Sequence, residues 1–285
     1  MNFRKKIKKI KSYFILSTES RLIMILLLCL VSLLFTVGCS NKNKPPADDN
    51  NNAENMKEII WRGHATIQLN SQEKNIVMYI DPYNLDNQNN DLDNNNLNNK
   101  NNNLDKADII LITHAHYDHC SLADAIKIAK PSTIILATSD CMNNLEKLDV
   151  EKKVIVEPNK KYDINGIIVE TIPAYNINTK FHPKENNWVG YVINVNNRRY
   201  YHAGDTDNIP EMALLKEITL ANIDVAFLPV GGTYTMNAEE AVKAAGAFNP
   251  KKAIPIHYGS IVGTKEDAEL FKEKCDCDVE ILEEN

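Results

Sequence analysis

The stretch that decides the fold runs from Thr113 to Ser121 and contains His114-Ala115-His116-Tyr117-Asp118-His119-Cys120. It follows an apolar run, residues 107–113, that is typical of a buried strand. Because side chains alternate along an extended backbone, His114, His116 and Asp118 point to one side, and the turn into the next helix brings His119 beside Asp118. Buried imidazoles and carboxylates need partners, and a metal ion is a partner that they can share. The spacing therefore predicts a metal site at the end of a strand, with ligands enough for two ions.

Short apolar runs recur with turn residues between them, which predicts a strand-rich domain. The predicted strands are residues 59–61, 66–69, 76–80, 109–113, 133–137, 154–156, 167–172, 189–195, 200–203, 225–229 and 253–256. Helical periodicity falls at 122–130, 139–148, 210–218, 238–248 and 265–274. Hairpins come first, and alternating strands and helices follow. We therefore expect an α/β fold in which two sheets pack face to face with helices outside.

Residues of the types that bind metals repeatedly stand where these predicted strands end. Asp81 follows the strand at 76–80, His114 follows 109–113, Asp205 follows 200–203 through one glycine, and His257 follows 253–256. Strand ends gathered on one edge of a sheet make a cleft, so these residues can converge although they are far apart in sequence. The sequence therefore predicts one site built from several strand ends.

These residues together resemble the motifs of the metallo-β-lactamase-fold hydrolases. The resemblance covers essentially all of residues 57–285 and is carried by Asp81, by the H-x-H-x-D-H motif at 114–119, by Gly204-Asp205-Thr206 and by Pro255-Ile256-His257-Tyr258. Within that superfamily, the Gly63-His64-Ala65 element and the turn at 229–232 are most similar to the branch of the ascorbate-phosphate lactonase and the N-acyl phosphatidylethanolamine phospholipase D. The resemblance implies a four-layer αββα sandwich with a dinuclear metal site between the sheets.

The resemblance also implies a set of metal ligands. His114 and His116 would hold the first ion, Asp118, His119 and His257 would hold the second, and Asp205 would bridge the two. Relatives have a further histidine in a Pro-Ala-x-His context after the strand at 167–172, but this chain has Pro173-Ala174-Tyr175-Asn176. We expect His182, six residues further on, to be the third ligand of the first ion. The amide oxygen of Asn176 is the alternative, although imidazole suits zinc better than a neutral amide does.

Three other residues are expected near the metals without binding them. Asp81 is expected to accept a hydrogen bond from a ligand imidazole and to fix its tautomer. His64 is as well explained by a contact with substrate or a ligand as by a structural role. Tyr234 could line the pocket, although packing in a loop explains it slightly better.

The expected chemistry is hydrolysis, because two divalent ions that share a water lower its pKa toward neutrality. Asp118 would orient the resulting hydroxide or accept its proton. Zinc is the expected metal, with manganese or iron possible, and the expected substrate is a small or lipid-like ester, lactone or phosphodiester. A lipoprotein that binds a metal or ligand without turnover is the alternative. A redox protein is disfavoured because no flavin-binding domain is appended.

The N-terminal part of the sequence indicates export. Six basic residues within positions 4–11 precede an apolar run at 22–35, which is typical of a secretory signal, and the run ends at Thr36-Val37-Gly38-Cys39-Ser40, which looks like a bacterial lipobox. We therefore expect residues 1–38 to be removed and Cys39 to carry the lipid; an uncleaved anchor helix is the alternative. Residues 39–56 read as a disordered tether, and the asparagine-rich segment 84–103 as an inserted surface loop in the domain 57–285. Either way, the domain would lie outside the cytoplasm at the cell membrane.

The net charge and the cysteine content limit which partners and chemistry the sequence predicts. Without residues 1–38 the chain carries 25 Lys and Arg against 37 Asp and Glu, a formal charge of about −12. Such a chain repels polyanions, so no nucleic acid partner is expected. The C-x-C pair Cys275 and Cys277 is a weak signal for metal binding or redox chemistry. Cys120 reads as a small buried residue opening a helix, and the sequence assigns no disulfide.

Overall fold

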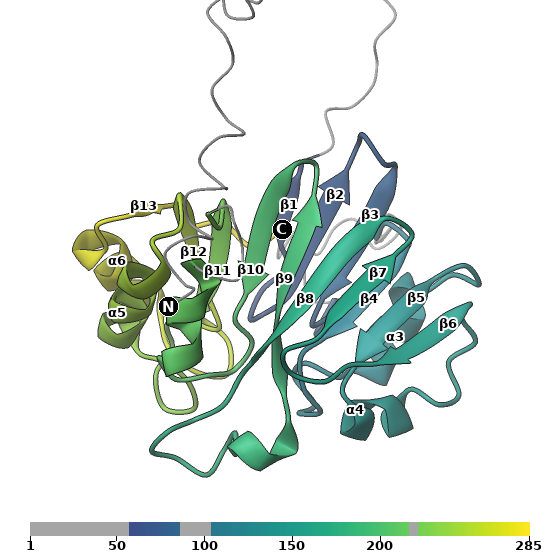
Figure 1. The fold of residues 1–285 in the computed structure, drawn as a ribbon, viewed down its shortest axis with the longest axis horizontal. Helices are drawn as coiled ribbons and strands as arrows, with labels where there is room; N and C mark the ends of the chain where they lie inside the picture. Colours follow the sequence, from purple (N-terminus) through teal and green to yellow (C-terminus); the bar gives the residue numbers. More distant parts are fainter. Residues whose placement is uncertain (1–56, 86–103, 217–221) are drawn as a thin grey trace, which may run out of the picture. The chain divides into compact units, whose positions relative to one another are not determined.

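The computed structural model describes residues 57–85, 104–216 and 222–285, and the predicted signal segment and tether lie outside these ranges. Two mixed sheets make up the described domain (Figure 1). The first has the order β1-β2-β3-β4-β5-β6, with strands Ile59–Trp61, Ile67–Ser71, Ile76–Ile80, Ile109–Ile112, Ile134–Ala137 and Lys152–Ile155. The second has the order β13-β12-β11-β10-β9-β8-β7, with strands, from β7 to β13, Lys161–Ile164, Ile167–Pro173, Val189–Val195, Arg198–His202, Val225–Pro229, Lys252–Ile256 and Asp278–Val279.

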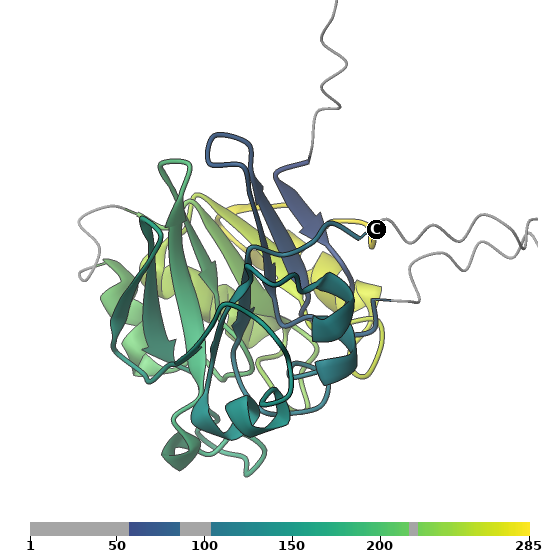
Figure 2. The ribbon, with the colours of Figure 1, turned by 90° about the vertical axis from the view of Figure 1, so that its right-hand side faces the viewer.

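Helices cover the outer face of each sheet. The helices are α3 (Leu122–Ile128), α4 (Ser139–Asn144), α5 (Ala238–Phe248) and α6 (Lys265–Lys274), with short 3₁₀ helices η1 (Lys184–Asn186) and η2 (Pro210–Lys216). In Figure 1, α3 and α4 lie beside β4–β6, and α5 and α6 lie beside β11–β13. Figure 2 shows the blue strands of the first sheet facing the green strands of the second. This is the predicted αββα sandwich of the metallo-β-lactamase type.

Strand β4 shows how the layers form, because it is apolar on both faces. Ile109 and Leu111 belong to the core between the sheets, whereas Ile110 and Ile112 belong to the core under α3 and α4. A parallel strand covered on both sides needs an uninterrupted apolar run, and this one has it. All four residues are fully or almost fully buried, so packing holds the end of β4, from which the H-x-H-x-D-H segment starts.

The predicted elements agree with the structure except at some ends and edges. The predicted helix 139–148 ends at Asn144, and the one at 210–218 is a 3₁₀ helix as far as the structure describes it, Pro210–Lys216. Strands β7 and β13 were not predicted, because they are short edge strands with charged residues and no long apolar run. Apart from Asn84 and Leu85, the predicted asparagine-rich loop 84–103 lies outside the described residues. Leu85 is buried, and the backbone N–H groups of Asn84 and Leu85 donate to Asp124.

Candidate metal centre

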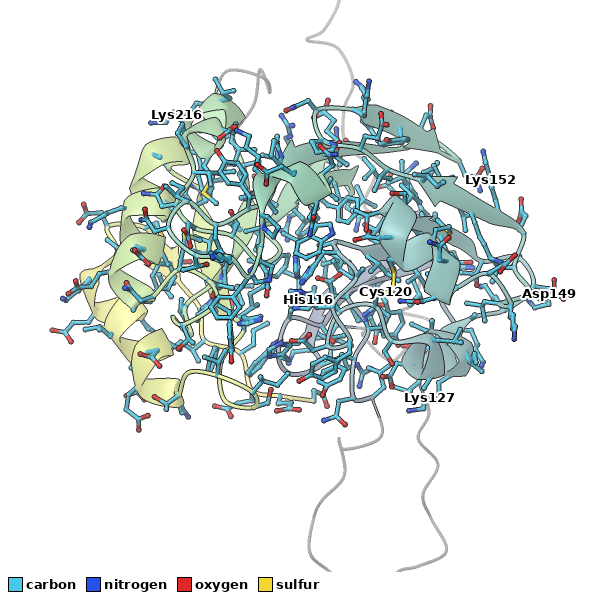
Figure 3. The ribbon with its side chains drawn as sticks, turned by 90° about the horizontal axis from the view of Figure 1, so that it is seen from below. His116, Cys120, Lys127, Asp149, Lys152 and Lys216 are labelled. Atoms are coloured by element: carbon cyan, nitrogen blue, oxygen red, sulfur yellow. A yellow bond between two sulfur atoms is a disulfide. The ribbon has the colours of Figure 1, made fainter. Side chains whose placement is uncertain are left out.

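The H-x-H-x-D-H segment leaves β4 and turns at once into α3. The backbone N–H groups of His119 and Cys120 donate to the His116 carbonyl at 3.1 and 2.8 Å, which closes the turn. Ser121 then caps α3 by accepting a hydrogen bond from the backbone N–H of Asp124. Figure 3, seen from below, places His116 near the middle of this face and Cys120 beside it. The turn gathers the segment's imidazoles and carboxylate at the lower edge of the two sheets.

Asp205 lies at the centre of the site. Its Oδ2 is 3.1 Å from Nε2 of both His182 and His257, and its Oδ1 is 3.3 Å from Nε2 of His119. Nε2 of His114 is 3.9 Å from Oδ2. Asp205 follows β10 through Gly204, whose φ is +65° and where a Cβ would lie 3.1 Å from the Val189 carbonyl and 3.2 Å from Thr113. Glycine is therefore required where the chain turns to present Asp205.

The predicted metal ligands converge into overlapping groups. Three sets of side chains have ligand atoms within 4.8 Å of one another: His114, His116 and His182; His64, Asp118, His119 and His257; and His114, His119 and Asp205. All seven residues predicted as ligands lie in these groups, although they come from four separate segments. His64 was not predicted among the ligands and lies in the second group.

Several of these atoms are buried without a hydrogen bond. Nε2 of His119, His182 and His257 and Oδ1 of Asp205 are all buried and make no hydrogen bond of good geometry, although the three nitrogens lie 3.1–3.3 Å from Asp205. Each such atom costs roughly 1–3 kcal/mol if it stays unsatisfied. Three imidazole nitrogens and a carboxylate oxygen aimed at one another are the donor set that zinc and similar divalent ions take. The chemistry of the site therefore fits metal ions.

The opposite nitrogens of two histidines are held by a chain of hydrogen bonds that ends at Asp81. His119 Nδ1 lies 2.8 Å from Asp81 Oδ2, which is the contact expected of Asp81. The Thr113 hydroxyl donates to the same carboxylate at 2.7 Å and lies 2.9 Å from His114 Nδ1. The Thr113 backbone N–H donates to Asp81 Oδ1 at 2.8 Å. Thr113 was not predicted as a site residue, and its position between β4 and His114 is the only sequence signal that points to it.

His182 is held by an amide and a backbone carbonyl. Its Nδ1 lies 2.9 Å from Asn176 Oδ1 and 3.1 Å from the Tyr234 carbonyl. Asn176 Oδ1 also accepts from the His182 backbone N–H at 3.0 Å and from Thr179 Oγ1 at 2.7 Å. Because these three contacts fill the lone pairs of an amide oxygen, Asn176 orients His182 in this arrangement. Tyr234 contributes its carbonyl here, and its side chain lines the cleft.

His64 holds Asp118. His64 Nε2 lies 3.0 Å from Asp118 Oδ2, and the Ser260 hydroxyl lies 3.3 Å from His64 Nδ1. Burial lowers the pKa of His64 to about 4, although the Asp118 hydrogen bond opposes this change, so the ring is neutral at pH 7. The neutral ring can donate one hydrogen bond to Asp118 and accept one from Ser260. Sequence reasoning did not identify Ser260.

The charges around the site favour protonation of His119, at the position where a cation would bind. Burial by itself lowers the pKa of His119, but Asp205 and Asp81 outweigh it and raise this pKa well above its usual value. Burial raises the pKa of Asp205, yet His119 and His257 bring it well below its usual range. For His114, burial and the neighbouring His119 both lower the pKa. A metal ion bound by His119 must therefore displace a proton, which makes binding dependent on pH.

Three residues of the site have left-handed backbone conformations. The φ angles are +48° for His64, +47° for Asp81 and +59° for His257. Such conformations cost about 1 kcal/mol or more for residues other than glycine. The surrounding structure holds them: the His257 backbone N–H donates to the His64 carbonyl at 2.9 Å, and the Asp81 N–H donates to the Leu111 carbonyl at 2.9 Å. Strain collected at three site residues is typical of a functional centre.

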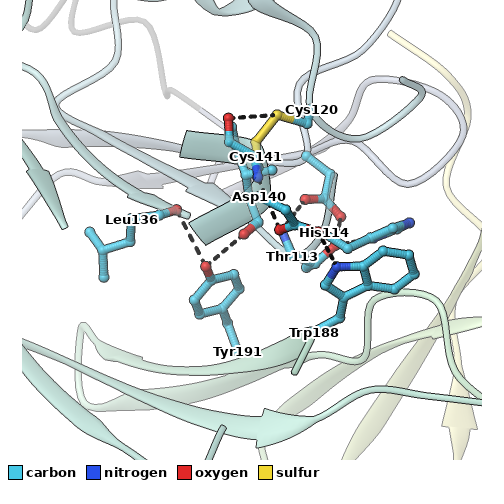
Figure 4. The surroundings of a disulfide bond; sticks show 10 residues. Thr113, His114, Cys120, Leu136, Asp140, Cys141, Trp188 and Tyr191 are labelled. Atoms are coloured by element: carbon cyan, nitrogen blue, oxygen red, sulfur yellow. Dashed lines mark hydrogen bonds between the residues drawn. A yellow bond between two sulfur atoms is a disulfide. The ribbon is translucent and has the colours of Figure 1, made fainter. Parts of the chain in front are cut away.

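A disulfide lies directly behind the H-x-H-x-D-H segment (Figure 4). It joins Cys120 to Cys141 in α4, and both residues are buried. Asp140, beside Cys141, accepts a hydrogen bond from Trp188 Nε1 at 2.7 Å, and the Trp188 ring lies 4.9 Å from the His114 ring. Cys275 and Cys277 are paired as well. The sequence predicted Cys120 as buried but gave no pairing, because cysteine spacing alone does not define one.

Comparison with known proteins places the chain in a family. Residues 58–257 match the model of the Beta-lactamase superfamily domain. The UPF0173 metal-dependent hydrolase of Thermococcus kodakarensis is 32% identical over 218 residues, which cover 76% of this chain and 91% of the relative. A crystal structure described as a metal-dependent hydrolase, from Parabacteroides distasonis, is 31% identical with a TM-score of 0.63, and the match covers 78% of this chain and 91% of that one. The metallo hydrolase Igni18 of Ignicoccus hospitalis, 23% identical with a TM-score of 0.61 over 80% of this chain and 95% of that one, shows the fold alone.

The two-sheet fold and its buried His and Asp clusters define a metal-dependent hydrolase of the metallo-β-lactamase superfamily. Within that superfamily, the chain belongs to the UPF0173 family of metal-dependent hydrolases.

Proposed function

We propose that this chain is a dinuclear hydrolase of a small or lipid-like ester, lactone or phosphodiester, as in the branch of the ascorbate-phosphate lactonase and the phospholipase D. The observation that carries the proposal is the convergence of three buried Nε2 atoms on Asp205. His114, His116 and His182 would hold one ion, and Asp118, His119 and His257 would hold the other, with Asp205 between them. Such a pair of ions supplies an acidified water and polarises the substrate's oxygen.

Asp118 is the proposed catalytic residue. Its carboxylate lines the cleft and is held by His64 at 3.0 Å, so it has a fixed direction. Burial raises its pKa, but the His64 hydrogen bond and His119 outweigh burial and lower the pKa overall. An ionised, oriented carboxylate at the cleft floor can position the attacking water and accept its proton.

Zinc is the proposed metal, because imidazole nitrogens dominate the donor set; manganese or iron would suit it if the cell supplied them. The alternative to an enzyme is a lipoprotein that binds metal without turnover. The ionised Asp118 at the cleft floor supports the enzyme.

We further propose that the protein is a lipoprotein anchored through Cys39 on the outer face of the cell membrane. The signal segment and lipobox support this, and so does the buried Cys120–Cys141 disulfide, since disulfides persist mainly in oxidising compartments. Within the described ranges, every helix is too short or too polar to cross a bilayer. Mass spectrometry of the membrane-extracted protein tests the anchor. A chain that begins at Cys39 and carries a diacylglyceryl group there is expected, and a chain that still begins at Met1 would contradict the proposal.

The test of the enzyme is metal content by elemental analysis, together with hydrolysis of ester, lactone and phosphodiester substrates before and after chelation. We expect two ions per chain and activity that chelation abolishes and added metal restores. His116→Ala should lose metal and activity, whereas Cys275→Ala should keep both. Full activity in metal-free His116→Ala protein would overturn the mechanism, and bound metal without turnover would favour the binding protein.

A further inference from the structure

The cleft above the metal centre has a polar floor and apolar walls. It encloses about 210 Å³ and its floor consists of the proposed ligands. Its walls are Tyr117, Phe181, Tyr234 and Ile261. In such a pocket the polar residues contact the reacting bond of the substrate, whereas the apolar residues contact the group attached to that bond.

The walls are unusually exposed for such side chains. Tyr117, Phe181 and Ile261 have exposed fractions of 68%, 48% and 38%. They are three of the seven large apolar side chains exposed in the described part of the chain. Others, such as Ile126 in α3 and Ile155 in β6, do not line the cleft. Single exposed apolar residues are ordinary, but three gathered at the mouth of one cleft indicate a binding surface.

Two wall residues lie directly beside proposed ligands in the sequence. Tyr117 lies between His116 and Asp118, and Phe181 directly precedes His182. Ring contacts support three of the four wall residues: Phe181 meets Tyr234 edge to face at 4.7 Å, and Tyr117 meets Tyr83 at 5.9 Å. The three aromatic walls are therefore held beside the metal centre, as a specificity pocket requires.

The described lining of the cleft offers no lysine or arginine to an anionic substituent. Lys180, the cation next to Phe181, lines a separate hollow with Tyr175 and Lys184. An anionic group away from the reacting bond would lose water without gaining an ion pair.

Resting on the proposed hydrolase function, we propose that these walls bind an uncharged apolar acyl or aryl group of a carboxylic ester or lactone, and that Phe181 and Ile261 set the length accepted. In the reaction, the oxygen of water joins the acyl carbon, the bond from that carbon to the alcohol oxygen breaks, and the alcohol oxygen takes up a proton. The acid and the alcohol are the products, and no oxidant or further reactant is needed.

Binding of alkylhydroxamates to the zinc-loaded protein tests this without turnover, because the hydroxamate group binds metal and the alkyl chain probes the walls. By titration calorimetry, we expect affinity to rise about threefold per CH₂ from two to eight carbons. Phe181→Ala and Ile261→Ala should each lower the affinity for the eight-carbon compound about tenfold and leave acetohydroxamate unchanged. The matched control, Ile155→Ala, should change neither. An eight-carbon hydroxamate ending in a carboxylate should bind about tenfold more weakly than the uncharged one.

The outcomes separate this inference from the function on which it rests. Affinity that is independent of chain length, or tighter binding of the carboxylate-ended compound, overturns the apolar pocket even if hydrolysis persists. Zinc-loaded protein that binds no hydroxamate at all, and hydrolyses no substrate, contradicts the hydrolase itself. If chain length has no effect and Phe181→Ala instead weakens binding to phosphatidylglycerol vesicles, the walls are a membrane contact and the proposal is wrong.

Discussion

Two segments of this molecule bring an imidazole to Asp205, and they do so by different means. The segment after β4 presents His119, whose Nε2 lies 3.3 Å from Asp205, and a buried carboxylate, Asp81, holds its other nitrogen. The segment after β8 presents His182 at 3.1 Å, and a neutral amide, Asn176, holds its other nitrogen. The same alignment is thus reached once with a charge and once without.

The two hydrogen bonds differ in their strength and in the charge of the acceptor. A hydrogen bond to an ionised carboxylate is roughly twice as strong as one to an amide, and it raises the basicity of the ring. The first segment also leaves a strand buried on both faces, whereas the second carries the exposed Ile177 and Phe181. We therefore expect the first segment to dominate metal affinity and its dependence on pH.

The largest effect should follow removal of the group that both segments share. Asp205→Ala takes away the carboxylate between the two proposed ions, so we expect loss of at least one ion and a fall in kcat/KM on the order of 10³-fold. Elemental analysis and kinetics measure this. The exposed Asp276→Ala is the control, and unchanged metal content in Asp205→Ala would show that Asp205 holds no ion.

Variants of Asp81 and Asn176 compare the two residues that hold these imidazoles in place. Asp81→Asn should lower metal affinity about 100-fold, because it removes a charge-assisted bond to His119 and disturbs the contacts with Thr113. Asn176→Ala should lower it only about tenfold, because a neutral hydrogen bond is lost. Competition with a chromophoric chelator gives both values. Equal losses would mean that the charge of Asp81 adds nothing.

The pH dependence sharpens the same contrast. The pKa of His119 is raised above its unfolded value of 6.5, so its proton stabilises the metal-free fold below pH 6.5 and this contribution is lost as the pH rises through the raised pKa. Above pH 6.5, His64 and His114 contribute no further change, because their pKa values are lowered. Urea unfolding of the metal-free protein should therefore show decreasing stability as the pH rises above 6.5.

Metal affinity should rise over the same range, because the ion replaces the proton of His119. In Asp81→Asn both dependences should weaken, whereas in Asn176→Ala they should persist. A metal-free protein whose stability stays constant across this range would contradict the raised pKa of His119.

The smallest effect on the metal site should come from the disulfide, which fastens only the first segment. Replacing both Cys120 and Cys141 by serine should lower the free energy of unfolding by about 3 kcal/mol, with metal content unchanged at 25 °C. Urea unfolding with and without metal checks this, and the Cys275→Ser and Cys277→Ser pair serves as a comparison. Loss of metal in the Cys120 and Cys141 variant would show that the disulfide positions the ligands.

The sequence by itself determined the αββα fold and the residues that gather at the site. Short apolar runs and polar residues placed where strands end predicted two packed sheets with a site at their edge, and the resemblance to the metallo-β-lactamase-fold hydrolases implied the αββα layers and the ligand set. The replacement of the expected histidine by Asn176 was also visible, and His182 was predicted as the ligand in its place.

Only the tertiary structure decided which side chains hold the proposed ligands in place. The contacts of Asn176 with His182, of His64 with Asp118 and of Asp81 with His119 join side chains that are brought together by turns and packing. The apolar walls of the cleft likewise come from segments between residues 117 and 261. Strand patterns fix which way a side chain points within its own strand, but its partner depends on how the two sheets pack and on backbone conformations, such as the left-handed ones at His64 and Asp81, that no local pattern encodes.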